Sequence, residues 1–195
     1  VTRRMIFHHP LPLFPDAASA SGIRPVQMKR SFEELGYEVW EVTGYTRERA
    51  ERAADVRYAM RCGTRFDFCY SESSTMPMTM TNPTHLPTRP FLDLRFFRSL
   101  RRSGIPVGQF LRDIYWVFPD YRESLPFLKL RAALAAYEWD MRTLRHHVDR
   151  VFLPSLKVGE YINLGNVPIS ALEPGHGHAE PLPGPGEGVS LFYVG

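Results

Sequence analysis

The sequence predicts an α/β fold in which a mostly parallel sheet carries helices on both faces. Short apolar stretches of strand length alternate with longer stretches in which apolar residues recur at helical spacing. Such regular alternation implies right-handed crossovers and parallel strand pairing. The hydrophobic content of 44% is that of a globular protein. No apolar run approaches the roughly 20 residues that cross a bilayer.

The first part of the chain is expected to contain three strands and two helices. The strands are expected at residues 5–8, 37–44 and 65–72, and the helices at 24–35 and 46–63. Met28, Phe32 and Leu35 share one face of the first helix, and Gly36 ends it. The second helix carries opposite charges one turn apart and is expected to lie on the surface.

The second part continues the same alternation. Helices are expected at residues 85–104 and 126–146, and strands at 105–116, 148–155 and 167–172, with room for a short helix before the last strand. Proline opens the first of these helices and Gly104 closes it. The strand 105–116 is expected to end in a polar tip. Together the elements indicate a Rossmann-like domain.

The composition changes after Leu172. Residues 173–188, EPGHGHAEPLPGPGEG, are rich in proline and glycine, which is typical of a linker. The apolar stretch VSLFYVG (189–195) is expected to be a strand. We therefore expect a Rossmann-like domain over 1–172, a linker, and the first strand of a second domain. The alternative is that this last strand closes the sheet of the first domain.

Three motifs, taken in their order along the chain, indicate a resemblance to one family. MIFHHPLPLFPDAASASGIRPVQMKRSFEELGYEVWEVTG (5–44) supplies a strand, a glycine-containing loop, a helix and a second strand. VDRVFLPS (148–155) is a strand before a serine-started helix, and ALEPGHG (171–177) is a turn before the linker. In this order the motifs resemble the N-terminal, acceptor-side domain of family 4 glycosyltransferases, which is one half of a glycosyltransferase B fold.

The resemblance implies transfer of a sugar from a nucleotide-sugar donor to a glycan or a lipid-linked acceptor, with retention of anomeric configuration. It implies no metal and no cofactor, because the nucleotide sugar is a substrate. It also implies that a C-terminal domain holds most of the donor, so residues 1–195 alone are expected to be inactive. The implied location is cytoplasmic, with peripheral contact at the inner face of the membrane.

The loop SASGIRP (19–25) between the first strand and the first helix is a candidate binding site. Ligands of open α/β sheets bind outside the carboxyl ends of the strands, where amides at a helix N-terminus favour anions. Ser19, Ser21 and the amides around Gly22 would contact a phosphate or a sugar hydroxyl, and Arg24 would add charge. The alternative is an ordinary helix cap.

The stretch FLRDIYW (110–116) offers a candidate catalytic carboxylate. Asp113 is expected at the strand tip, where it would accept the proton of the attacking hydroxyl, while Tyr115 would contact the apolar face of a sugar or lipid. Many family 4 glycosyltransferases, which this sequence resembles, carry a histidine in this region. The alternative is a capping aspartate paired with Arg112. Glu72, at the tip of the third strand, is a further substrate-binding candidate.

The helix expected at 85–104 is both basic and apolar. Arg95, Arg98 and Arg102 fall on one of its faces, which would suit an anionic lipid surface carrying a lipid-linked acceptor. The alternative is a solvated face of a helix packed on the sheet.

Other features exclude several functions. The net charge of +3 is too small, without a known motif, to indicate nucleic-acid binding. No histidine pair has the spacing of a zinc site, and His8 and His9 are expected to be structural. Cys62 and Cys69 form no CxxC motif and are expected to be packing residues of a reduced protein. Residues 1–7 contain no signal-peptide core.

Two rival functions remain open. A nicotinamide-dependent oxidoreductase is disfavoured because no G-x-G-x-x-G follows the first strand and no acidic residue ends the second. A self-contained module that binds a sugar phosphate or a partner would be favoured if residues 189–195 paired within the main sheet.

Overall fold

The computed structural model describes residues 2–173 and has the predicted α/β architecture. Six parallel strands pair in the order β2-β1-β3-β4-β5-β6. The strands are β1 (Arg4–His9), β2 (Glu38–Thr43), β3 (Phe68–Glu72), β4 (Val107–Phe110), β5 (Arg150–Leu153) and β6 (Ile169–Ala171). The proposed second-domain strand and nearly all of the proposed linker lie outside the described residues.

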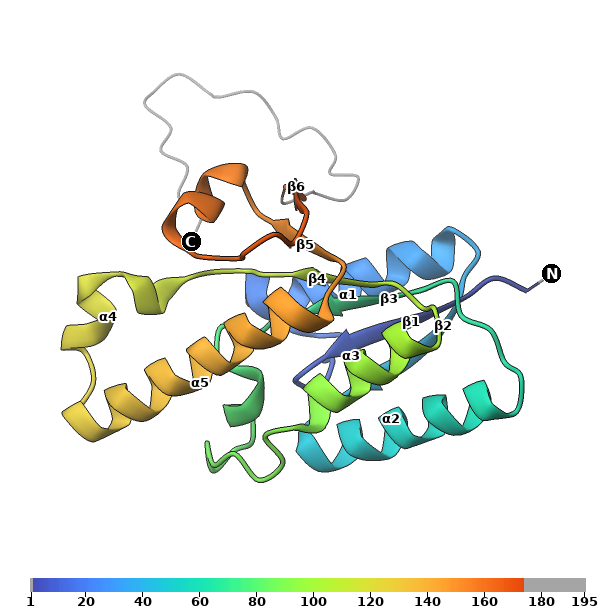
Figure 1. Cartoon of the computed structure of the whole chain (residues 1–195), viewed down its shortest axis with the longest axis horizontal. Helices are drawn as coiled ribbons and strands as arrows, with labels where there is room; N and C mark the ends of the chain where they lie inside the picture. The colour runs from blue at the N-terminus through green and yellow to red at the C-terminus, as the bar shows by residue number, and fades with distance from the viewer. Residues whose placement is uncertain (1, 174–195) are drawn as a thin grey trace, which may run out of the picture.

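Helices cover both faces of this sheet, as predicted (Figure 1). The α-helices are α1 (Ala20–Glu34), α2 (Thr46–Arg61), α3 (Leu92–Arg102), α4 (Pro119–Glu123) and α5 (Phe127–His147). Short 3-10 helices follow β3, β4 and β5: η1 (Met78–Met80), η2 (Tyr115–Val117) and η3 (Leu156–Tyr161).

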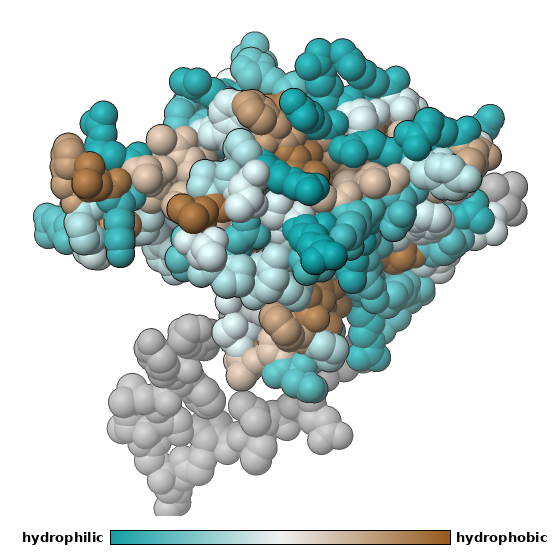
Figure 2. All heavy atoms as spheres, turned by 90° about the horizontal axis from the view of Figure 1, so that it is seen from below, coloured by the Kyte–Doolittle hydropathy of each residue, from teal (hydrophilic) through white to brown (hydrophobic). Residues whose placement is uncertain are grey.

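The core has two layers because successive strand residues point to opposite faces. Met5 and Phe7 pack with Met28 and Phe32 of α1 on one face. On the other face the larger core includes Ile6 of β1 and residues of α2, α3 and α5. Figure 2 shows mostly hydrophilic side chains on one side of the molecule, with apolar ones gathered at the projecting end where α4 and the start of α5 lie.

The strand order reverses direction between β1 and β3. The chain passes from β1 to β2 on one side, and from β3 through β4 to β6 on the other. In open parallel sheets the crevice outside the carboxyl ends of the strands at such a switch point is where ligands bind. Here β1 ends at His9, β3 at Glu72 and β4 at Phe110, so these residues border the crevice.

Several predicted boundaries are wrong. The first helix, expected from residue 24, begins at Ala20, so Ser21, Gly22 and Arg24 belong to its first turns and not to a loop. The helix expected from residue 85 begins at Leu92, because Pro87 and Pro90 disfavour helical backbone in the residues that precede them. The strand expected over 105–116 ends at Phe110. The amide of Arg112 then leaves the sheet ladder and donates to Ser73 Oγ at 3.0 Å. Asp113 therefore lies beyond the end of β4 rather than at its tip.

Candidate functional site

A buried carboxylate with two arginines lies at the carboxyl ends of the strands, at the switch point. Glu72, the last residue of β3, has a side chain with no solvent exposure. Its Oε1 lies 3.2 Å from Nε of Arg24 on α1 and 3.1 Å from Nη2 of Arg112 beyond β4. The Tyr70 hydroxyl donates to Oε2 at 3.3 Å. The Arg24 guanidinium lies over the ring of Phe110, 3.8 Å from its centroid. The sequence predicted Arg24 and Glu72 as site residues, and the fold brings them together.

The charges of this cluster do not cancel. Burial raises the pKa of the Glu72 carboxyl, and the guanidiniums of Arg24 and Arg112 oppose that increase. An ionised Glu72 between two arginines leaves one net positive charge. Nε and Nη2 of Arg24 and Nε of Arg112 are buried and have no hydrogen-bond partner among the described residues. Buried donors normally find a partner, so these three nitrogens have unused hydrogen-bonding capacity, which a ligand oxygen could reach only if the side chains move.

Residues 19–25, expected to be a loop, cap and begin α1. Ser19 is the N-cap, and its Oγ accepts from the Gly22 amide at 3.3 Å and lies 3.0 Å from the Ser21 Oγ. A Cβ on Gly22 would lie 2.6 Å from the Cβ of Ala17, so close packing of the first turn of α1 against the preceding residues requires glycine here. Capping and packing thus account for these residues locally, and their contact with a ligand stays a prediction.

Asp113 follows Arg112 and is half-buried. The ion pair of Arg112 is with Glu72, whereas the Tyr115 backbone and the charge of Arg112 also act on the Asp113 carboxyl, so a capping role for Asp113 stays open. Burial raises the pKa of the Asp113 carboxyl, while the nearby Thr75 side chain and Arg112 charge oppose the increase. Oδ1 of Asp113 is buried and has no partner among the described residues. Tyr115, at the start of η2, is 57% exposed.

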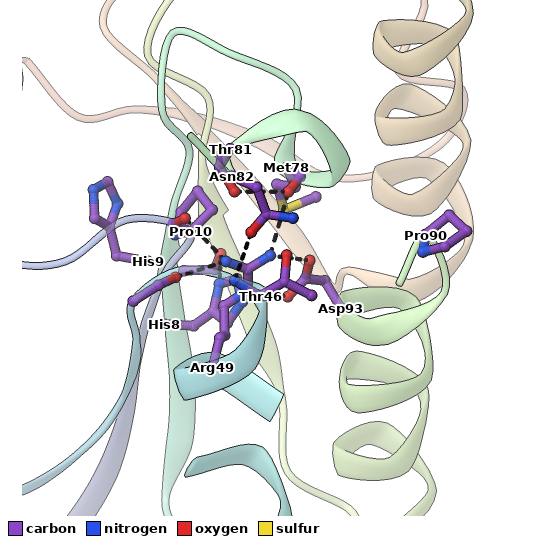
Figure 3. A network of polar contacts seen from close by, with 12 residues as sticks. His8, His9, Pro10, Thr46, Arg49, Met78, Thr81, Asn82, Pro90 and Asp93 are labelled. Atoms are coloured by element: carbon purple, nitrogen blue, oxygen red, sulfur yellow. Dashed lines mark hydrogen bonds and ion pairs between the residues drawn. The ribbon is translucent and has the colours of Figure 1, made fainter. Parts of the chain in front are cut away.

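A second polar network lies behind the crevice and was not predicted. Arg49 of α2 is buried, and its Nε and Nη2 donate to the two carboxylate oxygens of Asp93 on α3 at 2.8 and 3.1 Å. It also donates to the carbonyls of Pro10 at 2.9 Å, Gly44 at 2.7 Å and Met78 at 3.3 Å (Figure 3). Arg49 therefore links the three segments that follow β1, β2 and β3 by hydrogen bonds. The prediction that α2 is only a surface helix is wrong at this residue.

The two histidines that end β1 have different partners. His8 is fully buried, with Nδ1 2.8 Å from Ser71 Oγ and Nε2 2.9 Å from Asp93 Oδ1. His9 points away from this network in Figure 3, and its Nδ1 donates to the Glu72 carbonyl at 2.9 Å. Burial lowers the pKa of both rings. The row Ser71–His8–Asp93 includes the residue types of a hydrolase triad, but a substrate has no access to it. We therefore assign it a structural role.

Within residues 2–173, His, Cys, Asp and Glu form no group of three or more that could hold a metal ion. Of the helices described, none has both the length and the apolar character to cross a membrane. The histidines of HGH (176–178) lie outside the described residues. Comparison with family models and with curated protein sequences found no match to this chain.

Proposed function

We propose that this chain is the acceptor-side domain of a glycosyltransferase, which moves a sugar from a nucleotide-sugar donor to a glycan or a lipid-linked acceptor. One observation carries the proposal: Arg24 and Arg112 converge on the buried Glu72 at the switch point, with donor nitrogens that have no partner among residues 2–173. A diphosphate group is the anion that such a pair of guanidiniums suits, and both the donor and a lipid-linked acceptor carry one.

The geometry suits the chemistry of glycosyl transfer in a second way. The acceptor oxygen forms a bond to the anomeric carbon, the bond from that carbon to the donor phosphate breaks, and the nucleoside diphosphate leaves with the electron pair. The acceptor proton then needs a base. Asp113 is half-buried next to Arg112, and its raised pKa suits a group that takes up a proton. The exposed ring of Tyr115 would contact the sugar or the lipid.

Several parts of the proposal rest on the resemblance described above. These are retention of configuration, a donor held mainly by a C-terminal domain, and a cytoplasmic protein in peripheral contact with the membrane. Arginines that neutralise the leaving diphosphate would let the reaction proceed without a metal ion.

A second candidate function uses the same cluster. Two guanidiniums around one carboxylate also suit a module that binds a sugar phosphate without transferring the sugar. Phosphate binding is common to both functions, so binding tests the site and transfer separates the two. The nicotinamide alternative stays disfavoured, because the segment after β1 holds Gly22 alone rather than the three glycines of the dinucleotide motif.

The binding experiment is a nuclear magnetic resonance titration of the 195-residue chain. The probes are UDP-glucose, GDP-mannose and a water-soluble short-chain prenyl diphosphate sugar. We expect shifts at the Arg24 and Arg112 side chains, and roughly tenfold weaker binding for Arg24→Gln and for Arg112→Gln. Arg30→Gln is the control, since Arg30 lies on the same helix, is exposed and pairs with Glu34. Equal affinity in all variants would overturn the assignment of the site.

A further inference from the structure

A basic groove lies at the opposite end of the strands from Glu72. It is a hollow of about 590 Å³ between the C-terminal ends of α3 and α5. Arginines 98, 101 and 102 and His147 line its sides, and Ile105 and Pro106 contribute apolar surface. These residues precede β4 and β5, so they lie at the amino ends of the strands. The proposed transfer site does not use any of them.

The carboxylate that lines this groove, Asp149, already accepts hydrogen bonds from the protein. Asp149 accepts from Arg101 Nε at 2.9 Å through Oδ1, and from the Val107 amide at 2.8 Å through Oδ2. Arg101 also donates to the carbonyl of His146 at 2.8 Å, near the end of α5. That bond offsets part of the negative dipole end of the helix, which otherwise disfavours an anion. Arg101 and Asp149 therefore balance each other within the groove.

Two arginines are left without a counter-charge. Arg98 and Arg102 are exposed and form no ion pair with any residue between 2 and 173. They reach the groove from successive turns of α3, since residues four apart lie on one face of a helix. A guanidinium presents parallel N–H donors that match the oxygens of a phosphate.

We propose that this groove binds a phosphate group, carried by a small molecule or by a lipid headgroup. A hollow of this size is typical of small-molecule sites. Ile105 and Pro106 provide apolar surface for the part of the ligand that bears the phosphate. The site is independent of the proposed transfer reaction, because it lies at the amino ends of the strands, whereas Arg24 and Arg112 meet at the carboxyl end of β3.

His147 provides a readout within the groove. Burial and the charges of Arg98, His146 and Arg101 lower the pKa of its imidazole. A phosphate dianion bound between the arginines reverses the electrostatic part of this effect, so the pKa of His147 rises when the site is filled. A ligand that merely associates with the exposed face of α3 leaves His147 unchanged.

The test uses two probes on the 195-residue chain, inorganic pyrophosphate and phosphatidylcholine vesicles with or without phosphatidylglycerol. We expect one or both phosphate probes to bind, with affinity falling about tenfold in Arg98→Gln/Arg102→Gln. Pyrophosphate binding accompanied by a rise in the His147 pKa indicates a free phosphate ligand. Binding only to vesicles that contain phosphatidylglycerol, with the same loss in the double variant, indicates a headgroup.

Arg95→Gln is the matched control, since Arg95 is exposed on the same helix but does not line the groove. The proposal is overturned if neither probe binds, if the double variant binds as well as the unmodified chain, or if Arg95→Gln causes the same loss. The last result would identify general attraction to a basic helix. None of these outcomes bears on the site around Glu72.

Discussion

Nε of Arg24 lies 3.2 Å from Oε1 of Glu72, and the carboxylate that it approaches has no exposure to solvent. The same oxygen lies 3.1 Å from Nη2 of Arg112. One atom thus joins α1, β3 and the segment after β4 at the point where the strand order reverses. Breaking a buried ion pair costs several kcal/mol because a charge is left uncompensated, so this relationship is important to both the fold and the site.

Glu72→Gln preserves the shape of the side chain but leaves the two guanidiniums without a counter-charge. We expect the free energy of unfolding, measured in urea, to fall by about 3 kcal/mol. The affinity for a nucleotide sugar should rise, because the cluster gains one net positive charge. Glu34→Gln removes an exposed partner on α1 and should change little. A Glu72→Gln protein as stable as the unmodified chain would show that the cluster does not hold these elements together.

His9 should make the protein less stable in acid. Burial and the charges of Arg112, His8 and Arg49 lower the pKa of His9 from 6.5 to about 3. Below pH 6.5 the unfolded chain binds a proton that the folded chain does not, so stability falls as the pH drops. The loss from this residue is about 2 kcal/mol at about pH 5.

The measurement compares urea unfolding of the unmodified chain and of His9→Asn across this pH range. Asn keeps a donor for the Glu72 carbonyl but does not titrate. The advantage of the unmodified chain should therefore shrink steadily from neutral pH downward. Two parallel stability curves would show that His9 is not buried in its neutral form.

Asp140 should have the opposite pH dependence. Burial raises the pKa of its carboxyl to about 8, Asp93 adds to the increase, and the Met78 amide and Arg49 oppose it. Its Oδ2 accepts from the Met78 amide at 2.7 Å. Its Oδ1 and Oε1 of Gln109 have no partner among the described residues, and both side chains line one cavity of about 10 Å³. The folded state holds a proton that the unfolded state loses, so stability falls as the pH rises toward 8.

Asp140→Asn should remove this cost. An asparagine can keep the bond from Met78 and offer an N–H toward Gln109, so we expect a higher free energy of unfolding, with a larger gain at about pH 8 than at about pH 5. Thermal or urea unfolding at both pH values measures it. A variant less stable at the higher pH would mean that Asp140 is ionised and favourably paired.

Gly22→Ala should disturb the first turn of α1, which leads to Arg24. The new Cβ would lie 2.6 Å from the Cβ of Ala17, and neither atom can rotate away. Overpacking costs about 1–3 kcal/mol, while alanine recovers up to about 1 kcal/mol of helix propensity, so the net effect is destabilising. Ser21→Ala tests the same turn without the clash and should be milder in urea unfolding. Equal effects would show that the glycine is not needed for packing.

The sequence was sufficient to predict the sheet and most of its helices, because apolar periodicity and glycine stops are local signals. It also placed Glu72 at a strand end and Arg24 beside the crevice. It did not predict that Arg49 is buried, since an arginine within TRERAERAADVR has the pattern of a solvated helix face. Its partner Asp93 is 44 residues away, and only the packing of α2 against α3 brings the two together.

Arg112 shows the same limit at the site itself. Sequence proximity suggested a pair with Asp113, but the order of strands places Arg112 beside Glu72, 40 residues earlier. Strand order is a non-local property, and the local pattern of residues 110–116 does not contain it. The start of α3 at Leu92 could have been predicted from the sequence, because Pro87 and Pro90 disfavour helical backbone before them.

Sugar transfer itself tests the central claim most directly. The product of the whole reading frame that contains residues 1–195 is incubated with labelled nucleotide sugars and with glycan or lipid-linked acceptors. We predict transfer with retention, a rate lower by roughly a hundredfold or more for Asp113→Asn, and no transfer by residues 1–195 alone. The proposed function is contradicted if no nucleotide sugar supports transfer. Transfer by residues 1–195 alone would contradict the division of the site between two domains.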